Sequence, residues 1–401
     1  MRTSQRQAGH QLQLLQGSQA FFEALVQDVD ASLHEVRLET YIFNVQGGGG
    51  LVLQALERAA VRGVAVFLVV DGVGTPELPA PWPQRLTAAG VQWRVFSPLG
   101  RLGLLVPSRW RRLHRKLCVV DGLVAFCGGI NVLDDWFDPN HGALSAPRFD
   151  FAVRVTGPLV QSVHAAMGQF WWRLQAAQRA KQVDWLGVWQ ALQQAVQETR
   201  RSTAVEVANG GAWAELVLRD NLRFRSRIER AYRQALGEAR HDIVLANAYF
   251  LPGRKIRLSL VHAAQRGVRV RLLLQGRYEY FMQYHAAHAL YGALLAAGIE
   301  IYEYTPSFLH AKVAVVDGRW ATVGSSNMDP LSLLLAREAN VVVQDEAFAQ
   351  GLQHCLEQAI DHHAHRVDAS LHARRSLRLR VFDRVAYLLM RGLLFLNGKR
   401  Y

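Results

Sequence analysis

The chain has 401 residues, of which half are apolar and a fifth are charged, and it carries a formal net charge of +13. This composition excludes an intrinsically disordered protein, and the length allows two ordinary domains, each with its own core. The basic balance predicts a polyanionic partner, either nucleic acid or an anionic membrane surface. The three cysteines are too few for a disulfide framework, which fits a reducing compartment.

The chain also has no obvious targeting or membrane-spanning segment. No apolar run reaches the ~18 residues that a membrane span needs. The first residues contain no apolar core of signal-peptide length. We therefore expect a protein that is cytosolic or that lies on a membrane from the cytosolic side.

The predicted elements begin with alternating helices and strands that occur twice. A helical segment ending at Gly63 precedes a short apolar strand at Val64–Val70, and the same arrangement returns at Gly267 and Val268–Leu274. The sequence AAVRGVAV in the first copy matches AAQRGVRV in the second. Two such copies predict an α/β fold of two similar domains, which arose by internal duplication and are related by a pseudo-twofold axis.

The repeat divides the chain into four parts. We expect a first α/β domain at 1–160, a helical connector rich in Trp and Gln at 161–205, a second α/β domain at 206–350 and a basic helical tail at 351–401. In the connector, Phe170, Trp171 and Trp172 are expected to pack the helix onto the domains rather than to form a lipid-facing rim.

The tail combines positive charge with apolar residues. From Arg366 onward it carries nine basic and two acidic residues, and Arg384 and Arg391 interrupt its apolar stretch. This pattern is typical of a basic amphipathic helix that lies in the membrane interface, and the alternative is a helix that covers the second domain. The histidines earlier in the tail lack a metal-ligand spacing, so we expect no metal there.

One sparse polar pattern occurs once in each copy, as His114-x-Lys116-x4-Asp121-x6-Gly128-Gly129-x-Asn131 and as His310-x-Lys312-x4-Asp317-x6-Gly324-Ser325-x-Asn327. The chain holds only five lysines against forty-one arginines, and two of the five occupy matching positions in this pattern. Such selective use of lysine beside histidine indicates that a compact ammonium is needed there, which a guanidinium would not replace.

Strand geometry predicts how each copy presents these side chains. Residues two apart in a strand share a face, so the histidine and the lysine of each copy project together. The Asp-Gly pair that follows is a strong hairpin signal, which makes Asp121 and Asp317 architectural although they belong to the motif. The returning strand then brings Asn131, or Ser325 and Asn327, back beside the histidine-lysine pair.

These groups suit phosphoryl transfer. Ammonium and amide groups donate hydrogen bonds to phosphoryl oxygens, and an imidazole can attack phosphorus or transfer a proton. If the two halves face each other, one site receives two histidines, two lysines and two asparagines. One histidine then serves as nucleophile while the other protonates the leaving oxygen, and two lysines neutralise a phosphodiester without a metal.

The two copies resemble the HKD motifs of the phospholipase D superfamily, and in particular its bacterial cardiolipin synthase branch. The resemblance covers about residues 10–350 and includes Ala246–Phe250, Ala321–Leu333 and Arg337–Val341. Gly129 replaces the usual serine of the first motif, in a form similar to that of this branch.

The resemblance implies a role for each site residue. His114 would attack phosphorus and His310 would act as acid and base, with the opposite assignment open. The remaining motif residues are Asp121 and Asp317 and the groups that would bind phosphoryl oxygens, namely Lys116, Lys312, Asn131, Asn327 and Ser325. Glu338 and Asp150 resemble the acidic residue that orients a motif histidine through its other ring nitrogen. No cofactor or metal is implied.

The implied activity is phosphatidyl transfer to phosphatidylglycerol, which makes cardiolipin and releases a small alcohol. The expected partners are anionic phospholipids, with phosphatidylglycerol or phosphatidylethanolamine as donor, and no nucleic acid. The expected place is the cytoplasmic face of the bacterial inner membrane, bound peripherally. A phospholipid hydrolase or a nuclease of phospholipase D type would use the same site. An inactive membrane-binding adaptor is a third class, which the two intact histidine-lysine pairs disfavour.

Overall fold

The computed structural model describes residues 7–100, 103, 106–201, 211–220, 224–329 and 336–396. The chain forms two compact units. Unit 1 comprises Met1–Asp134 and Ala152–Val217, and unit 2 comprises Asp135–Phe151 and Leu218–Tyr401. The segment Asp135–Phe151 therefore belongs with the second unit, although strands of unit 1 precede and follow it in sequence. Residues 330–333, part of the stretch that resembles the family, lie outside the described residues.

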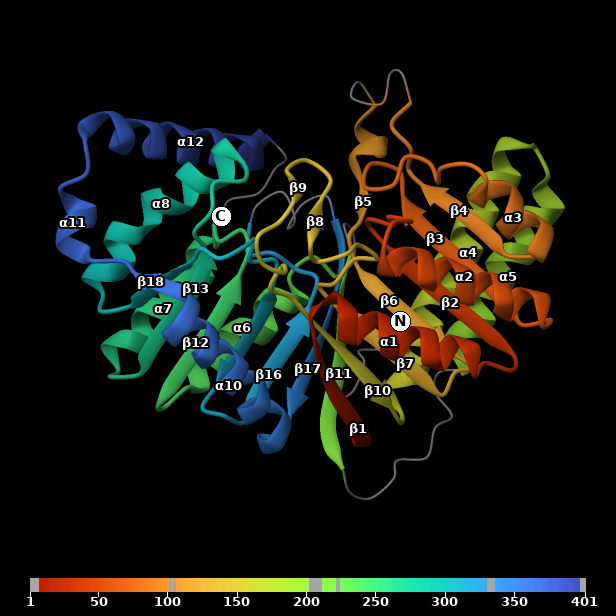
Figure 1. Ribbon diagram of the computed structural model, residues 1–401, viewed down its shortest axis with the longest axis horizontal. Coiled ribbons are helices and arrows are strands. Elements are labelled where there is room, and N and C mark those ends of the chain that lie inside the picture. Colours follow the sequence, from red (N-terminus) through yellow and green to blue (C-terminus); the bar gives the residue numbers. More distant parts are fainter. Residues whose placement is uncertain are drawn as a thin grey trace. The chain divides into compact units, whose positions relative to one another are not determined.

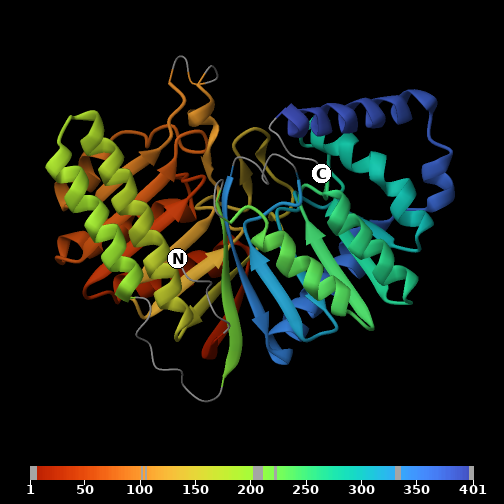
Figure 2. The same cartoon turned by 180° about the vertical axis from the view of Figure 1, so that it is seen from behind.

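Unit 1 is built around a mixed sheet whose strands follow the order β1-β10-β7-β6-β2-β3-β4. The pairs β2–β3 and β3–β4 are parallel, whereas β2–β6, β6–β7 and β7–β10 are antiparallel. Helices α1 and α2 lie on one face of this sheet, and α4, with α5 packed on it, lies on the other (Figure 1 and Figure 2). The bounds are β1 Gln7–Gln16, α1 Gly17–Asp30, β2 Glu35–Thr40, α2 Gly48–Val61, β3 Ala65–Asp71, α3 Trp82–Ala89, β4 Gln92–Phe96, β5 Arg112–Leu113, β6 Lys116–Val120, β7 Val124–Gly128, β10 Phe151–Thr156, α4 Leu159–Lys181 and α5 Trp185–Arg201.

Unit 2 repeats this plan with the strand order β18-β14-β13-β12-β15-β16-β17. Helix α10 covers one face of its sheet, and α6 and α7 lie on the other (Figure 1 and Figure 2). The bounds are β8 Phe137–Asp138, β9 Gly142–Ala143, α6 Arg227–Glu238, β12 Asp242–Asn247, α7 Arg254–Gln265, β13 Arg269–Gln275, α8 Phe281–Ala296, β14 Glu300–Tyr304, β15 Lys312–Val316, β16 Trp320–Gly324, β17 Ala336–Gln344, α10 Glu346–His363, β18 Ala364–Arg366, α11 Ala369–Ala373 and α12 Leu377–Leu396. Strand β11, Ala212–Arg219, belongs to unit 1 up to Val217.

The duplication predicted from the sequence is confirmed in its details. The helix before β3 and the helix before β13 end alike, because Gly63 and Gly267 both adopt positive φ, at 92° and 87°. The next N–H in each copy, that of Val64 or Val268, donates back into the helix at 3.1 Å. These glycine caps turn the chain directly into a buried strand, as the pattern indicated.

The aromatic residues of the connector divide into two groups. Phe170 and Trp171 on α4 are each only 3% exposed and pack against unit 1, so the packing interpretation is confirmed. Trp185 and Trp189 on α5 are 68% and 62% exposed. Sequence reasoning did not single out this second pair, because alternation of Trp with Gln does not reveal which helix face meets the domain.

Helix α12 docks on α8 through a buried polar contact. Asp383, 3% exposed, accepts a hydrogen bond from Arg375 at 2.6 Å and lies 2.7 Å from Nδ1 of His285 on α8. Ala386 and Met390 are buried on the same face of α12. The tail helix thus covers unit 2, while its outer face carries exposed apolar side chains. In the part of the chain that the structure describes, no helix is long and apolar enough to span a membrane.

Candidate active site

The two motif aspartates hydrogen-bond to the backbone at the ends of the motif strands. Asp121 and Asp317 occupy the hairpin turns after β6 and β15 at φ of 51° and 52°, each followed by a glycine at positive φ. The Asp121 carboxylate accepts three backbone N–H bonds, from Leu33, His34 and Glu35, each at 2.8 Å. Each aspartate is separated from its motif histidine by a whole five-residue strand, which spans ~16 Å by strand rise. The structure therefore agrees with the architectural interpretation.

Asp317 makes the same three bonds in unit 2, to the N–H groups of residues 240–242 at 2.8–2.9 Å. Partial burial alone would raise the pKa of either carboxyl group. The N–H donors outweigh that effect and lower the pKa of both Asp121 and Asp317. Each carboxylate thereby fixes the start of a neighbouring strand, β2 or β12, to the end of the motif strand.

The motif histidines lie just outside the strands in which they were predicted. Strand β6 begins at Lys116 and β15 at Lys312, so each histidine precedes its strand by two residues. In both copies the lysine ammonium donates to the backbone carbonyl of its own histidine, at 2.7 Å for Lys116. This bond occupies the carbonyl and one of the three ammonium hydrogens, and it holds the lysine beside the histidine.

His310 has a carboxylate partner within unit 2. Its Nδ1 lies 2.6 Å from Oδ2 of Asp150, whose other oxygen accepts the N–H of Phe151 at 2.8 Å. The backbone is fixed too, since His310 N–H donates to Phe149 O at 2.9 Å. Asp150 is buried, so its negative charge favours a proton on Nδ1 and leaves Nε2 as the nitrogen for exchange.

Lys312 is fully buried next to this pair. Burial lowers its pKa to about 8, and the negative charges of Asp150, Glu338 and Glu279 oppose that shift. Ser325 and Glu338 meet in the same unit, where the serine hydroxyl donates to the glutamate carboxylate and accepts the N–H of Ala339 at 3.1 Å. The two residues are held together, and both are wholly buried.

The first motif has a different setting. The ring of His114 lies 5.1 Å from the ring of Tyr41, and the ammonium of Lys116 lies 5.6 Å from the same ring. The Asn131 side-chain oxygen accepts a hydrogen bond from the N–H of Ile42 at 3.1 Å. The amide NH₂ group of Asn131 is therefore the part that can donate to a ligand. Lys116 and Asn131 are buried. In unit 1 the His114 ring and the Lys116 ammonium thus lie by Tyr41, and the Asn131 amide bonds the next residue of the chain, Ile42.

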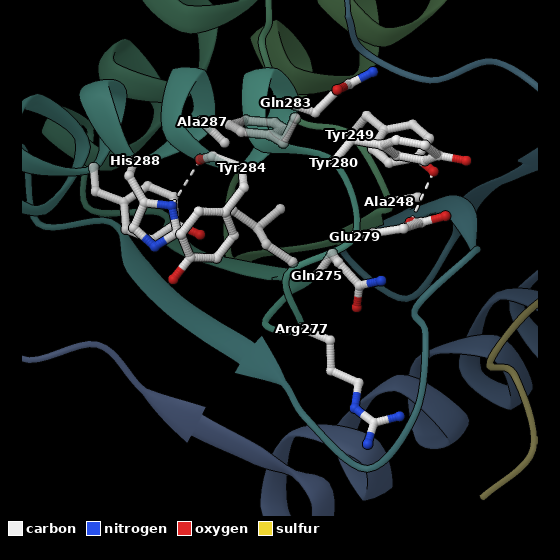
Figure 3. A pocket seen from close by; sticks show the side chains of 13 residues that line it. Ala248, Tyr249, Gln275, Arg277, Glu279, Tyr280, Gln283, Tyr284, Ala287 and His288 are labelled. Atoms are coloured by element: carbon white, nitrogen blue, oxygen red, sulfur yellow. Dashed lines mark hydrogen bonds between the residues drawn. The ribbon is translucent and has the colours of Figure 1, made fainter. Parts of the chain in front are cut away.

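A pocket in unit 2 was missed by the sequence reasoning. It lies between the ends of β12 and β13 and the start of α8, and Tyr249, Gln275, Arg277, Glu279 and Tyr280 line its polar part (Figure 3). Tyr249 OH donates to Oε2 of Glu279 at 2.8 Å. Burial raises the pKa of Glu279. In the sequence, the pocket is marked only by Glu279 between two tyrosines, Tyr278 and Tyr280. This triplet has no fixed spacing from the motif, so the sequence did not indicate a pocket.

Comparison with known proteins gives the class to which this fold and these motifs belong. Residues 25–146 and 232–360 match the family described as "Cardiolipin synthase, PLD-like domain". The chain therefore belongs to the phospholipase D-like family of cardiolipin synthases. It is 36% identical over 370 residues to cardiolipin synthase B of Escherichia coli K12, covering 92% of this chain and 84% of that protein. It is 28% identical over 386 residues to cardiolipin synthase A of Erwinia tasmaniensis, covering 94% and 75%.

Solved structures confirm the fold. Phosphatidylserine synthase of Haemophilus influenzae superposes with a TM-score of 0.67 at 10% identity, covering 99% of this chain and 96% of that one. Polyphosphate kinase of Porphyromonas gingivalis gives a TM-score of 0.55 at 15% identity, covering 96% and 53%. At such identities the likeness concerns the fold alone, and it bears out the duplicated α/β architecture.

Proposed function

We propose that this protein is a cardiolipin synthase, which transfers a phosphatidyl group to phosphatidylglycerol and releases a small alcohol. The observation that carries the proposal is the pairing of His310 with the buried Asp150 carboxylate at 2.6 Å, which prepares the histidine to exchange protons through Nε2. Membership of the cardiolipin synthase family and two intact histidine-lysine pairs support it. The proposed donor is a second phosphatidylglycerol.

The proposed reaction has two displacements at one phosphorus atom. Nε2 of His114 attacks the phosphodiester, a P–N bond forms, and the bond from phosphorus to the headgroup alcohol breaks while His310 supplies the proton. In the second step the hydroxyl of the acceptor gives its proton to His310 and attacks phosphorus, and the P–N bond breaks. Lys116, Lys312, Asn131 and Asn327 donate to the phosphoryl oxygens throughout.

The duplicated register extends the proposal to Glu338. In the antiparallel pairs after each motif, Gly128 faces Ala152 and Gly324 faces Asn340. Counting back two residues makes Asp150 and Glu338 equivalent. We infer that Glu338, like Asp150, serves to orient a motif histidine. A Glu338→Gln variant with unchanged turnover would contradict this role.

The outer face of α12 suits a membrane surface. Leu377, Val381 and Leu388 are 74%, 50% and 57% exposed and follow one side of the helix, and exposed Arg380 and Arg384 lie beside them. A basic edge beside an apolar stripe favours the interface of anionic lipid. The proposed location is the cytoplasmic face of the bacterial inner membrane. Val381→Glu should weaken sedimentation with phosphatidylglycerol vesicles, and unchanged sedimentation would count against this surface.

The test of the function is a product analysis. Purified protein receives labelled phosphatidylglycerol in mixed micelles with a chelator, and the products are identified by mass spectrometry. Cardiolipin with an equal amount of free glycerol supports the synthase. Phosphatidic acid alone would identify a hydrolase. If the lipid stays intact and single-stranded DNA is degraded in a parallel sample, the protein is a nuclease and the lipid assignment is wrong.

A further inference from the structure

The pocket of unit 2 lies at the same sheet edge as the second motif. Strand β12 pairs with β15 so that Asn247, its last residue, faces Lys312, the first residue of β15. The chain then passes from Asn247 directly into Ala248 and Tyr249, which line the pocket. The charge of Glu279 acts on Lys312 and raises its pKa against the effect of burial. A group held by Glu279 is therefore in the electrostatic field of the motif lysine.

The polar groups of this pocket combine one acceptor with one donor. Glu279 uses Oε2 for the Tyr249 hydroxyl, and among the described residues no bond is made to its Oε1. Gln275 uses its oxygen to accept the Leu309 N–H at 3.0 Å. Its Nε2 is buried and has no hydrogen-bond partner in the described part of the chain. A buried NH₂ group without a partner is costly, which points to a ligand that would satisfy it.

The aromatic and cationic groups narrow the chemistry of that ligand. Tyr280 lies on the lining beside Tyr249, with ring centroids 6.1 Å apart, and offers an apolar face to carbon-bound hydrogens (Figure 3). Arg277 is also a lining residue, and its positive charge opposes an ammonium headgroup in this pocket. A neutral ligand with two neighbouring hydroxyls fits best, because one hydroxyl can donate to Glu279 while the other accepts from Gln275.

We propose that this pocket is the alcohol subsite of the reaction and that it selects the glycerol headgroup. The inference rests on the proposed function and adds the identity of the groups that choose the alcohol. The alcohol that leaves in the first displacement and the one that enters in the second occupy the same position at phosphorus, opposite the nucleophile. One subsite therefore serves the released glycerol and the glycerol of the accepting phosphatidylglycerol in turn.

The test measures the choice between two alcohols by one enzyme preparation. Phosphatidylglycerol is the donor, and labelled glycerol and ethanol compete as acceptors at equal concentration, with phosphatidylglycerol exchange and phosphatidylethanol formation counted separately. Glu279→Ala and Gln275→Ala should each lower the glycerol-to-ethanol product ratio ~10-fold, the effect of one lost hydrogen bond to a buried group. Transfer to ethanol should fall less than transfer to glycerol, because ethanol has no second hydroxyl for the pocket to bind. Glu346→Gln, at an exposed glutamate on α10, is the matched control.

The outcomes separate this inference from the function on which it rests. An unchanged ratio in folded, active Glu279→Ala and Gln275→Ala variants would overturn the subsite and leave the synthase standing. Absence of transfer to either alcohol by the wild-type protein would overturn both.

Further variants refine the assignment of the pocket. Glu279→Gln keeps an acceptor oxygen and should retain part of the glycerol preference. A loss confined to phosphatidylethanolamine as donor would instead assign the pocket to an ammonium group. Tyr249→Phe provides a second, milder probe if the alanine variants do not fold.

Discussion

The two motif copies share their sequence pattern, their turns and their lysine bonds, yet their surroundings differ. His114 and Lys116 lie against the ring of Tyr41. In the second copy the register places Ala248 where the first has Tyr41, since Glu39 and Ala246 face equivalent residues of β6 and β15. Ala248 lines the polar pocket. At this one repeated position, the first copy has a tyrosine ring against the motif residues, and the second copy has an alanine that lines the pocket.

The two copies therefore share some features and differ in others. The parts that set the backbone, namely the glycine caps and the turn aspartates, are the same in both copies. The parts that meet the ligand have diverged. We therefore assign phosphoryl binding to both copies and alcohol selection to the second copy. Substitutions at matched positions of the two copies test that division.

The largest effect is expected at the histidines. His114→Ala and His310→Ala should each lower kcat by at least ~10³-fold, because one removes the nucleophile and the other the proton donor. Turnover of phosphatidylglycerol measured by mass spectrometry checks this, with His362→Ala on α10 as an exposed control. Substantial activity in either motif variant would mean that one copy works alone.

A smaller but still large loss is expected when the motif lysines become arginine. Lys116→Arg and Lys312→Arg keep the charge but place a planar fork where a buried ammonium bonds the histidine carbonyl, so activity should fall ~10–100-fold. Lys255→Arg, at an exposed position on α7, should be neutral. Near wild-type activity of Lys116→Arg would refute the argument from the scarcity of lysine.

The pH dependence should distinguish the two copies. Lys312 must be charged to neutralise the phosphodiester, and burial lowers its pKa to about 8. The ammonium is complete below that value and is lost as the pH rises through it, so kcat/KM should decline above pH ~8. Lys312→Arg should abolish this decline, because a guanidinium stays charged, whereas Lys116→Arg should keep it. A profile that remains flat in wild type to pH ~10 would contradict the assignment.

The smallest effect on catalysis is expected at the turn aspartates. Asp121→Asn and Asp317→Asn should each lower the free energy of unfolding by about 1–3 kcal/mol, because a charged acceptor of three N–H bonds is replaced. The pKa of both carboxyl groups is lowered, so their contribution is present above the unfolded value and disappears as the pH falls through the folded one. Denaturant unfolding checks the loss, and a kcat reduced as far as in the histidine variants would restore a catalytic role.

Much of this structure could be predicted because it depends on local pattern. The glycine caps at Gly63 and Gly267, the Asp-Gly turns and the buried strands are each written in a few adjacent residues. The pairing of Asp150 with His310 spans 160 positions, and no spacing rule connects them. Family resemblance alone suggested that Asp150 orients a motif histidine, and the structure shows that its partner is His310.

Two other features lay beyond sequence reasoning for physical reasons. The Tyr249–Glu279 pocket depends on where the loop after β13 folds back over β12, which propensity does not encode. The exposure of Trp185 and Trp189 depends on which face of α5 meets α4. In both places tertiary packing decides the role of residues whose types alone were ambiguous.

The most direct test of the central claim is to trap the covalent intermediate. Wild-type protein and the Asp150→Asn variant are mixed with labelled phosphatidylglycerol and quenched in alkali, where phosphohistidine survives. Peptide mapping by mass spectrometry then locates the label. The two-displacement mechanism predicts label on the peptide containing His114. Label on neither motif histidine, while cardiolipin still forms, would contradict it.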